Sequence, residues 1–179
     1  MVPLGFAGLS NVIVIAPEQP DDHWEIEALL DTAFAPGRTG LSSYRRRENV
    51  EPIRDLCLTA RDDDEAATLA GTIRFWPVQI GDSSEASLLL GPVAAHPTRQ
   101  GEGIGAMLIL EGLDRAVAAG WKRCILIGDE PFYARFGFKR SLAKAISFPP
   151  PTNPNRILAK TLVDGGMERI GGEVKPWRA

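Results

Sequence analysis

The feature that most constrains this chain is a glycine-rich segment between an apolar, strand-like run and its most regular helical run. The segment reads Gln100-Gly-Glu-Gly-Ile-Gly105; it follows Ala86–Ala95 and leads into Ile104–Ala119. Glycine lets a ligand approach the backbone without interference from a Cβ. The first turn of a helix presents unpaired N–H groups and the positive end of the helix dipole. The segment therefore predicts a loop that holds a phosphate at a helix start.

Several interpretations of this loop compete. A Walker loop is excluded, because no Gly-Lys-Ser or Gly-Lys-Thr follows. A dinucleotide fingerprint fits the letters, since Gly101-x-Gly103-x-x-Ala106 matches its loose form and Asp129 follows the next strand. Its context is poor, because Pro97-Thr98-Arg99 lengthens a turn that this motif keeps tight. The third phosphate-binding pattern is Gln100-x-x-Gly103-x-Gly105. The structural alternative to all three is a loop in which the glycines only cap the helix and turn the chain.

The remaining sequence predicts a mixed α/β fold. Strands are expected at residues 11–16, 57–60, 67–80, 86–95, 123–127 and 156–162, and helices at 23–34, around 50–54, 104–119 and 131–136. Because no repeat and no linker divides the chain, we expect one domain over residues 1–179.

Two details of these elements are specific enough to check. Pro77 indicates a bulge or an edge position in its strand. In the helix at 104–119, apolar Met107, Leu110 and Val117 lie on one face, charged side chains lie on another, and Gly120 ends the helix.

The net charge and the short apolar runs argue against nucleic acid and membrane as partners. Twenty basic and 23 acidic side chains give a net charge of −3, so no strong positive field attracts a phosphate backbone. The run Arg45-Arg46-Arg47 is followed at once by Glu48 and is interpreted as a solvated face. Apolar runs are far shorter than the ~20 residues that span a bilayer. No Lys or Arg precedes the first hydrophobic stretch, so a secretory signal is not expected and the cytoplasm is the expected location.

Cysteine and histidine usage indicates no metal site. Cys57 and Cys124 are the only cysteines, and each lies in an apolar run typical of a small buried side chain. His23 and His96 are the only histidines, and no metal-ligand spacing connects these four residues.

Two motifs in order carry a resemblance to a known family. Leu90-Gly-Pro-Val-Ala-Ala-His-Pro-Thr-Arg-Gln-Gly-Glu-Gly-Ile-Gly105 resembles the acetyl-coenzyme A (acetyl-CoA) loop of the GNAT N-acetyltransferase superfamily. Tyr133-Ala-Arg-Phe-Gly-Phe138, which begins 28 positions after Gly105, is similar to that superfamily's Tyr-x-x-x-Gly-Phe segment. Further pieces, including Ser43-Tyr44-Arg45, resemble the YhbS-like branch of predicted acetyltransferases, although residues 88–138 alone are diagnostic.

The resemblance implies a fold and an acetyl-CoA site. It implies a splayed, mostly antiparallel central sheet flanked by helices, in which Ala86–Ala95 and Arg123–Ile127 are the parallel pair. Backbone groups of Val93, Ala94 and Ala95 would pair with the pantetheine arm as another strand would. Amides from Gln100 through Gly101, Glu102, Gly103 and Ile104 to Gly105 would hold the pyrophosphate, and Arg99 would add charge near it.

The resemblance also implies how an acetyl group is transferred to an amine. Tyr133 occupies the position of the family's general acid, which protonates the departing thiolate. Glu130, with Asp129 beside it, stands where a general base is expected, although many relatives have asparagine in this region. Glu25, a water relay or His96 are alternatives for the base, and His96 is better explained as setting loop geometry.

The acceptor and the rival functions stay open at this stage. In the superfamily the acceptor is set by two loops, here residues 36–50 and 140–156, and the arginines of the first would suit a carboxylate-bearing amine. The acceptor is thus a small-molecule or peptide amine. Exposed late strands of relatives pair, so the resemblance allows a homodimer. A non-catalytic acyl-CoA sensor on the same scaffold and a dinucleotide-binding protein are the rivals.

Overall fold

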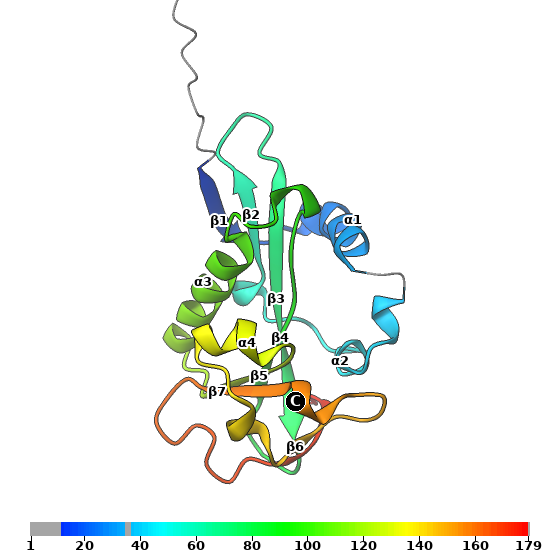
Figure 1. The fold of residues 1–179 in the computed structure, drawn as a ribbon, viewed down its shortest axis with the longest axis vertical. Coiled ribbons are helices and arrows are strands. Elements are labelled where there is room, and N and C mark those ends of the chain that lie inside the picture. Colours follow the sequence, from blue (N-terminus) through cyan, green and yellow to red (C-terminus); the bar gives the residue numbers. More distant parts are fainter. Residues whose placement is uncertain (1–11, 35–36, 179) are drawn as a thin grey trace, which may run out of the picture.

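A sheet of eight strands organises the fold in a computed structural model that describes residues 12–34 and 37–178. The strands are β1 Ile13–Pro17, β2 Leu58–Asp62, β3 Leu69–Ile80, β4 Ser87–Ala95, β5 Arg123–Ile127, β6 Ile146–Ser147, β7 Ile157–Thr161 and β8 Gly172–Pro176. The main path runs β1-β2-β3-β4-β5-β7, while β8 pairs with β3 and with β6. The helices are α1 His23–Ala33, α2 Ser42–Arg45, α3 Ile104–Ala118 and α4 Glu130–Tyr133. This is the expected mixed α/β architecture (Figure 1).

The parallel pair in the middle of the sheet is very short. Strands β4 and β5 align at Leu88 with Cys124 and at Leu89 with Ile125, whereas the neighbouring pairs β3–β4 and β5–β7 are antiparallel. Beyond Leu89, β4 continues for six residues without pairing with β5. The splay between these strands, expected from the sequence, is therefore confirmed.

A bulge in β4 lies at the point where the two strands part. Ile73 of β3 pairs with Val93 and Phe75 pairs with Leu90, so Gly91 and Pro92 together stand opposite the single residue Arg74. Gly91 has φ +125°, which a residue with a Cβ rarely adopts. The extra residue bends β4, and a β-bulge of this kind re-aims the strand beyond it.

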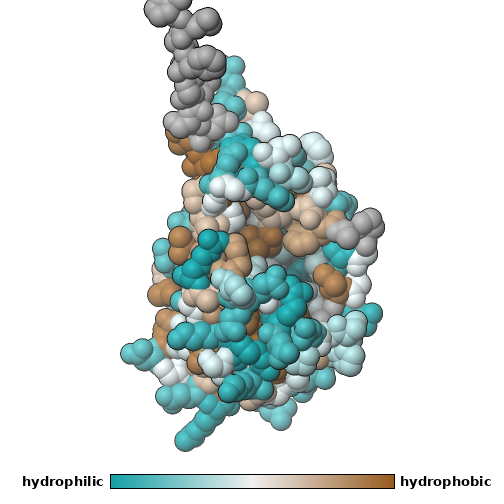
Figure 2. Space-filling view, viewed as in Figure 1, coloured by the Kyte–Doolittle hydropathy of each residue, from teal (hydrophilic) through white to brown (hydrophobic). Residues whose placement is uncertain are grey.

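Helices α1 and α3 cover opposite faces of the sheet (Figure 1). The buried face of α3 is Ile104, Leu108, Ile109, Leu113 and Ala116. The face that carries Met107, Leu110 and Val117 is not the core face, since these side chains are 36%, 53% and 47% exposed. Figure 2 shows such hydrophobic side chains over the outer surface of α3.

The end of α3 follows the sequence expectation. Gly120 has φ +84°, its N–H donates to the Val117 carbonyl, and the Trp121 N–H donates to the Ala116 carbonyl. These two bonds form a Schellman motif, which satisfies carbonyls at the end of the helix.

Several other expectations need correction. The predicted helix around 50–54 is wrong, because α2 lies earlier in the chain. At Ile53 the chain is extended, and the Ile53 N–H donates to the Phe75 carbonyl. This segment ends in a 3₁₀ turn at Arg54–Leu56. Strands β6 and β8 have no counterpart among the predicted strands. Of the two predictions for Pro77, the bulge is wrong and the edge position is confirmed locally. Strand β2 pairs with β3 no further than Ile73, and the pairing of β8 with β3 starts at Val78, so Pro77 faces a gap where its missing N–H is harmless.

A chain of ion pairs fixes α1 and the following loop to the sheet. Buried Arg74 of β3 bonds to Glu18 at 2.6 Å and to Glu27 of α1 at 2.8 Å. Glu27 also binds Arg38 at 2.6 Å, and Arg38 bonds to Asp31 at 2.8 Å. Burial acts to lower the pKa of Arg74, but the bonds to Glu18 and Glu27 outweigh it and raise that pKa, so Arg74 stays charged.

We expect Gly112→Val to destabilise the protein, because Gly112 lets α3 lie directly on the Phe75 ring. A Cβ at Gly112 would stand 2.6 Å from Cε2 and 2.9 Å from Cζ of Phe75, whose side chain is fully buried. Overpacking of this kind costs about 1–3 kcal/mol of unfolding free energy. Thermal or denaturant unfolding measures the change.

The matched control is Ala118→Val, at an exposed position of the same helix. Helix propensity alone predicts a loss of about 0.6 kcal/mol there. Equal effects of the two substitutions would contradict the close contact between Gly112 and Phe75.

Candidate active site

A groove opens at the start of α3, which we call the helix-start groove. It has a volume of about 430 Å³ and is lined by residues 93–95 of β4, by residues 99–101 and 103–106, and by Ile109, Phe132, Tyr133 and Arg135. Gly101 and Gly103 have φ +89° and +78°. A Cβ added at Gly101, Gly103 or Gly105 would meet no atom within 4 Å. The three glycines therefore leave open space at the N-terminus of α3, where unpaired N–H groups attract an anion.

The β4 side of this groove presents free backbone. Val93, Ala94 and Ala95 pair with Ile73, Thr72 and Gly71 of β3. Strand β5, on their other side, pairs with β4 no further than Leu89. This stretch of β4 is thus an internal sheet edge at which an extended group can form strand-like hydrogen bonds.

Arg99 lies in the groove wall, but its charge is already compensated. Its Nη1 binds Asp62 at 2.9 Å, and its Nη2 binds Glu102 at 2.8 Å. Hydrogen bonds to Asp62 and Glu102 raise the pKa of Arg99. Glu102 is the one predicted cofactor-binding residue that does not line the groove. The nearby ring of His96 bonds to the Thr98 hydroxyl at 2.8 Å and accepts from the Thr98 N–H, so this histidine shapes the turn.

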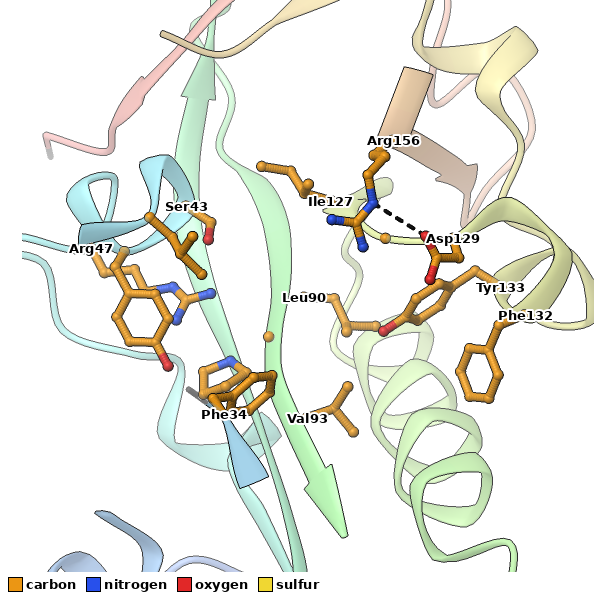
Figure 3. Close-up of a pocket in the computed structure, with 15 residues that line it drawn as sticks. Phe34, Ser43, Arg47, Leu90, Val93, Ile127, Asp129, Phe132, Tyr133 and Arg156 are labelled. Carbon is orange, nitrogen blue, oxygen red and sulfur yellow. Dashed lines mark hydrogen bonds and ion pairs between the residues drawn. The ribbon is translucent and has the colours of Figure 1, made fainter. Parts of the chain in front are cut away.

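Tyr133, in α4, stands where the helix-start groove meets a second pocket. This second pocket, which we call the central pocket, has a volume of about 390 Å³. Its lining comprises Phe34, Leu41, Ser43, Tyr44, Arg47, residues 90–93, residues 127–129, Phe132, Tyr133 and Arg156. Val93, Phe132 and Tyr133 line both cavities. Figure 3 shows the Tyr133 hydroxyl directed toward the middle of the central pocket.

Local sequence fixes the position of the Tyr133 ring. The ring packs edge-on against Phe132 and Phe138, with centroids 4.9 and 6.1 Å away. Gly128 leaves room for it, because a Cβ there would clash with the ring. Burial and, secondarily, the charge of Asp129 raise the pKa of Tyr133 above its usual value. The hydroxyl therefore keeps its proton at neutral pH, as a proton donor must.

The two acids at the end of β5 occupy different positions. Asp129 lines the central pocket and accepts a 3.2 Å bond from Arg156 Nε, as Figure 3 shows. Glu130 lines neither cavity, and its Oε1 accepts a 2.8 Å hydrogen bond from the Arg140 N–H. Glu25 of α1, the other carboxylate considered from the sequence, is ion-paired with Arg61. Of these three acids, Asp129 alone faces the space beside Tyr133.

The basic run after α2 is not uniformly solvated, contrary to the sequence interpretation. Arg45 is exposed, but Arg47 is 8% exposed and lines the central pocket. Arg156 was missed as a site residue, and Arg47 was predicted only as one of several arginines that would suit a carboxylate, because no local pattern distinguishes a buried arginine from a solvated one. Arg47 lies within residues 36–50 and Arg156 ends residues 140–156, the two loops expected to set the acceptor.

Within 12–34 and 37–178, no group of three or more His, Cys, Asp or Glu is arranged to hold a metal ion. None of the helices in those ranges has the length and apolar character to cross a membrane. Cys57 and Cys124 are free and buried, as expected.

The family model for the acetyltransferase (GNAT) domain matches residues 54–140. A GNAT family acetyltransferase from Brucella melitensis, solved with acetyl-CoA, is 30% identical with a TM-score of 0.68, covering 94% of this chain and 97% of that one. The GNAT family N-acetyltransferase YhbS from Escherichia coli, solved with CoA, is 25% identical with a TM-score of 0.79, covering 94% and 91%.

More distant structures share the fold alone. Naa50 from Arabidopsis thaliana, solved with a bisubstrate analogue, is 16% identical with a TM-score of 0.57, covering 83% of this chain and 97% of that one. A sequence search of the curated proteins found no match. Strand β4 pairs antiparallel with β3, and β5 pairs antiparallel with β7, which differs from the parallel sheet that a dinucleotide fold requires. The 30% identity with the Brucella melitensis protein extends over nearly all of both chains. Together with the glycine loop and the splayed strands, it shows that this chain belongs to the GNAT family of N-acetyltransferases.

Proposed function

We propose that this protein transfers the acetyl group of acetyl-CoA to a primary amine bound in the central pocket. The observation that carries the proposal is the meeting of two cavities at one tyrosine: Val93, Phe132 and Tyr133 line both. A donor in the helix-start groove and an acceptor in the central pocket would thus touch beside the Tyr133 hydroxyl. Holding two reactants in contact supplies a large part of the rate of such a transfer.

The helix-start groove fits the parts of acetyl-CoA in order. The open space at Gly101, Gly103 and Gly105 suits a pyrophosphate held by backbone N–H groups. The free edge of residues 93–95 suits the amides of a pantetheine arm. When bound, acetyl-CoA supplies the acetyl group as a thioester that a neutral amine attacks directly. With Asp62 and Glu102 already on its guanidinium, Arg99 would shape this groove rather than supply free charge to it.

Tyr133 is the proposed general acid. Its hydroxyl would donate a proton to the departing sulfur, and its raised pKa keeps that proton in place up to alkaline pH. Among the acids we favour Asp129 as the general base, because it faces the pocket. Asp129 would attract the ammonium form of the acceptor, accept a proton from that ammonium group and pass the proton to water. Glu130 is the less favoured acid, because it lines neither cavity. Location in the cytoplasm and pairing of two copies through the late strands stay predictions.

We expect Tyr133→Phe to lower kcat by roughly 10²-fold or more, because a positioned general acid contributes about 10²–10⁴-fold. The affinity for acetyl-CoA should change little, since the ring and its packing remain. The alkaline limb of the kcat/KM profile, which the raised pKa of Tyr133 moves to higher pH, should disappear in the variant. CoA release over a range of amines and pH values measures both effects.

The control is Phe132→Leu, which changes the neighbouring ring and keeps the hydroxyl. An unchanged kcat in Tyr133→Phe would remove Tyr133 from the chemistry. Binding of acetyl-CoA without CoA release for any amine, in the wild-type protein, would instead indicate a non-catalytic sensor.

Gly105→Leu should weaken acetyl-CoA binding without destabilising the free protein. Gly105 has ordinary helical geometry, and nothing lies within 4 Å of an added Cβ, so the new side chain enters the open groove. Ala118→Leu adds the same side chain at an exposed position of α3 and serves as the control. Calorimetric titration should give at least about a tenfold larger Kd for Gly105→Leu alone, as expected for a lost 1.4 kcal/mol. Equal affinity in both variants would place the pyrophosphate elsewhere.

A further inference from the structure

Arg47 is a buried cation that lacks hydrogen-bond partners. It follows α2, is 8% exposed and lines the central pocket. Neither its Nε nor its Nη1 has a hydrogen-bond partner in the described part of the chain. A buried charge without a partner is unfavourable, and proteins keep one mainly where something binds to it.

The surroundings of Arg47 hold the guanidinium in place without neutralising it. Its Cζ lies 4.3 Å from the centre of the Tyr44 ring and 5.5 Å from that of Trp76, both cation–π contacts. Its Nη2 is 3.4 Å from the position of a Cβ at Gly91, so the group packs against the β4 bulge. Figure 3 shows it directed toward the pocket interior, across β4 from Tyr133.

Neighbouring charges leave Arg47 as the cation with capacity for a ligand. Arg38 and Arg74 lie close to it, but both are ion-paired with Glu18, Glu27 or Asp31. Arg156, the other arginine that lines the central pocket, is ion-paired with Asp129. Burial lowers the pKa of Arg47 to about 10, with Tyr44 acting in the opposite direction. At neutral pH the side chain is therefore still charged. Its Nε and Nη1 are closed off from the cavity, so a ligand in the pocket would reach the guanidinium at Nη2, which lies beside the β4 bulge.

The opposite wall of the central pocket carries an ion pair. Asp129 is the one carboxylate among the residues that line the pocket, it lies beside Tyr133, and its Oδ1 accepts a 3.2 Å bond from Arg156. An ammonium group can approach that wall at Asp129 Oδ2, and an anionic group is attracted to the Arg47 wall. The pocket volume of about 390 Å³ suits a small molecule that carries both groups.

We propose that the acceptor is a small molecule bearing both a primary amine and a carboxylate, of the amino-acid class, and that Arg47 binds its carboxylate. The Arg47 Nη2 can donate a charge-assisted hydrogen bond to a carboxylate, which is roughly twice as strong as a hydrogen bond between neutral groups. This specificity rests on the proposed acetyl transfer, because the amine must reach the thioester beside Tyr133 while the carboxylate stays on Arg47.

The test compares amines that differ only in the carboxylate. The pairs are phenylalanine with 2-phenylethylamine, lysine with 1,5-diaminopentane, and 4-aminobutanoate with propylamine, assayed by CoA release at saturating acetyl-CoA. We expect kcat/KM for the carboxylate member of at least one pair to exceed that of its partner roughly tenfold or more. The same amino acid, without acetyl-CoA, should raise the melting temperature of the protein.

Arg47→Gln should abolish that preference, and Arg47→Lys should keep part of it. A hydrogen bond to a charged group is worth a factor of roughly 10–100 in binding, so kcat/KM for the amino acid should fall by this much in Arg47→Gln. The ratio of kcat/KM between the two members of each pair should therefore fall to about one in Arg47→Gln, whatever the absolute rates. Arg45→Gln removes an exposed charge from the same segment and is the matched control.

The outcomes separate this inference from the proposed function. Equal rates within every pair, a preference that survives Arg47→Gln, or neither acetylation nor thermal stabilisation by any of the three amino acids would overturn the role of Arg47. Acetylation of a C-terminally free tripeptide in preference to the amino acids would place the acceptor among peptides and overturn the proposed class. Failure of acetyl-CoA itself to raise the melting temperature would contradict the proposed function instead.

Discussion

The separation of β4 from β5 is the constraint on which the rest of the structure depends. Two aligned residue pairs hold these parallel strands together, and the bulge at Gly91 and Pro92 then turns β4 away. A sheet with a fully paired centre would have no free backbone at residues 93–95 and no space between α3 and α4. The same separation creates the helix-start groove on one side and the central pocket on the other, which is why a single tyrosine reaches both.

A chain of ion pairs holds in place the wall of the central pocket that carries Tyr44 and Arg47. The ion pairs from Glu18 through Arg74 and Glu27 to Arg38 and Asp31 hold α1 and the loop before α2 against the sheet. The Arg38 Nη1 bonds to the Tyr44 hydroxyl at 3.1 Å, and Tyr44 in turn stacks on Arg47. Partly buried pairs of this kind leave little freedom to the groups that they join, so the guanidinium of Arg47 is held before any ligand arrives.

The sequence predicts best those features whose causes are local. The glycine loop, the following helix with its Gly120 end and the strand at 123–127 each carry their own signal, and so segment 86–138 could be predicted closely. The core face of α3 could not, because Gly112 on Phe75 decides which side packs inward. The roles of Glu130 and Arg47 depend on contacts with Arg140, Trp76 and Gly91, which are distant in sequence or carry no pattern.

Amide hydrogen exchange with and without acetyl-CoA tests the central claim most directly. If the gap between β4 and β5 admits the donor, exchange should slow at amides of residues 93–95 that face the gap and at those of residues 101–106. Amides that become hydrogen-bonded on binding exchange more slowly, so these two segments should respond together. Unchanged exchange there, with protection appearing elsewhere in the chain, would contradict the account.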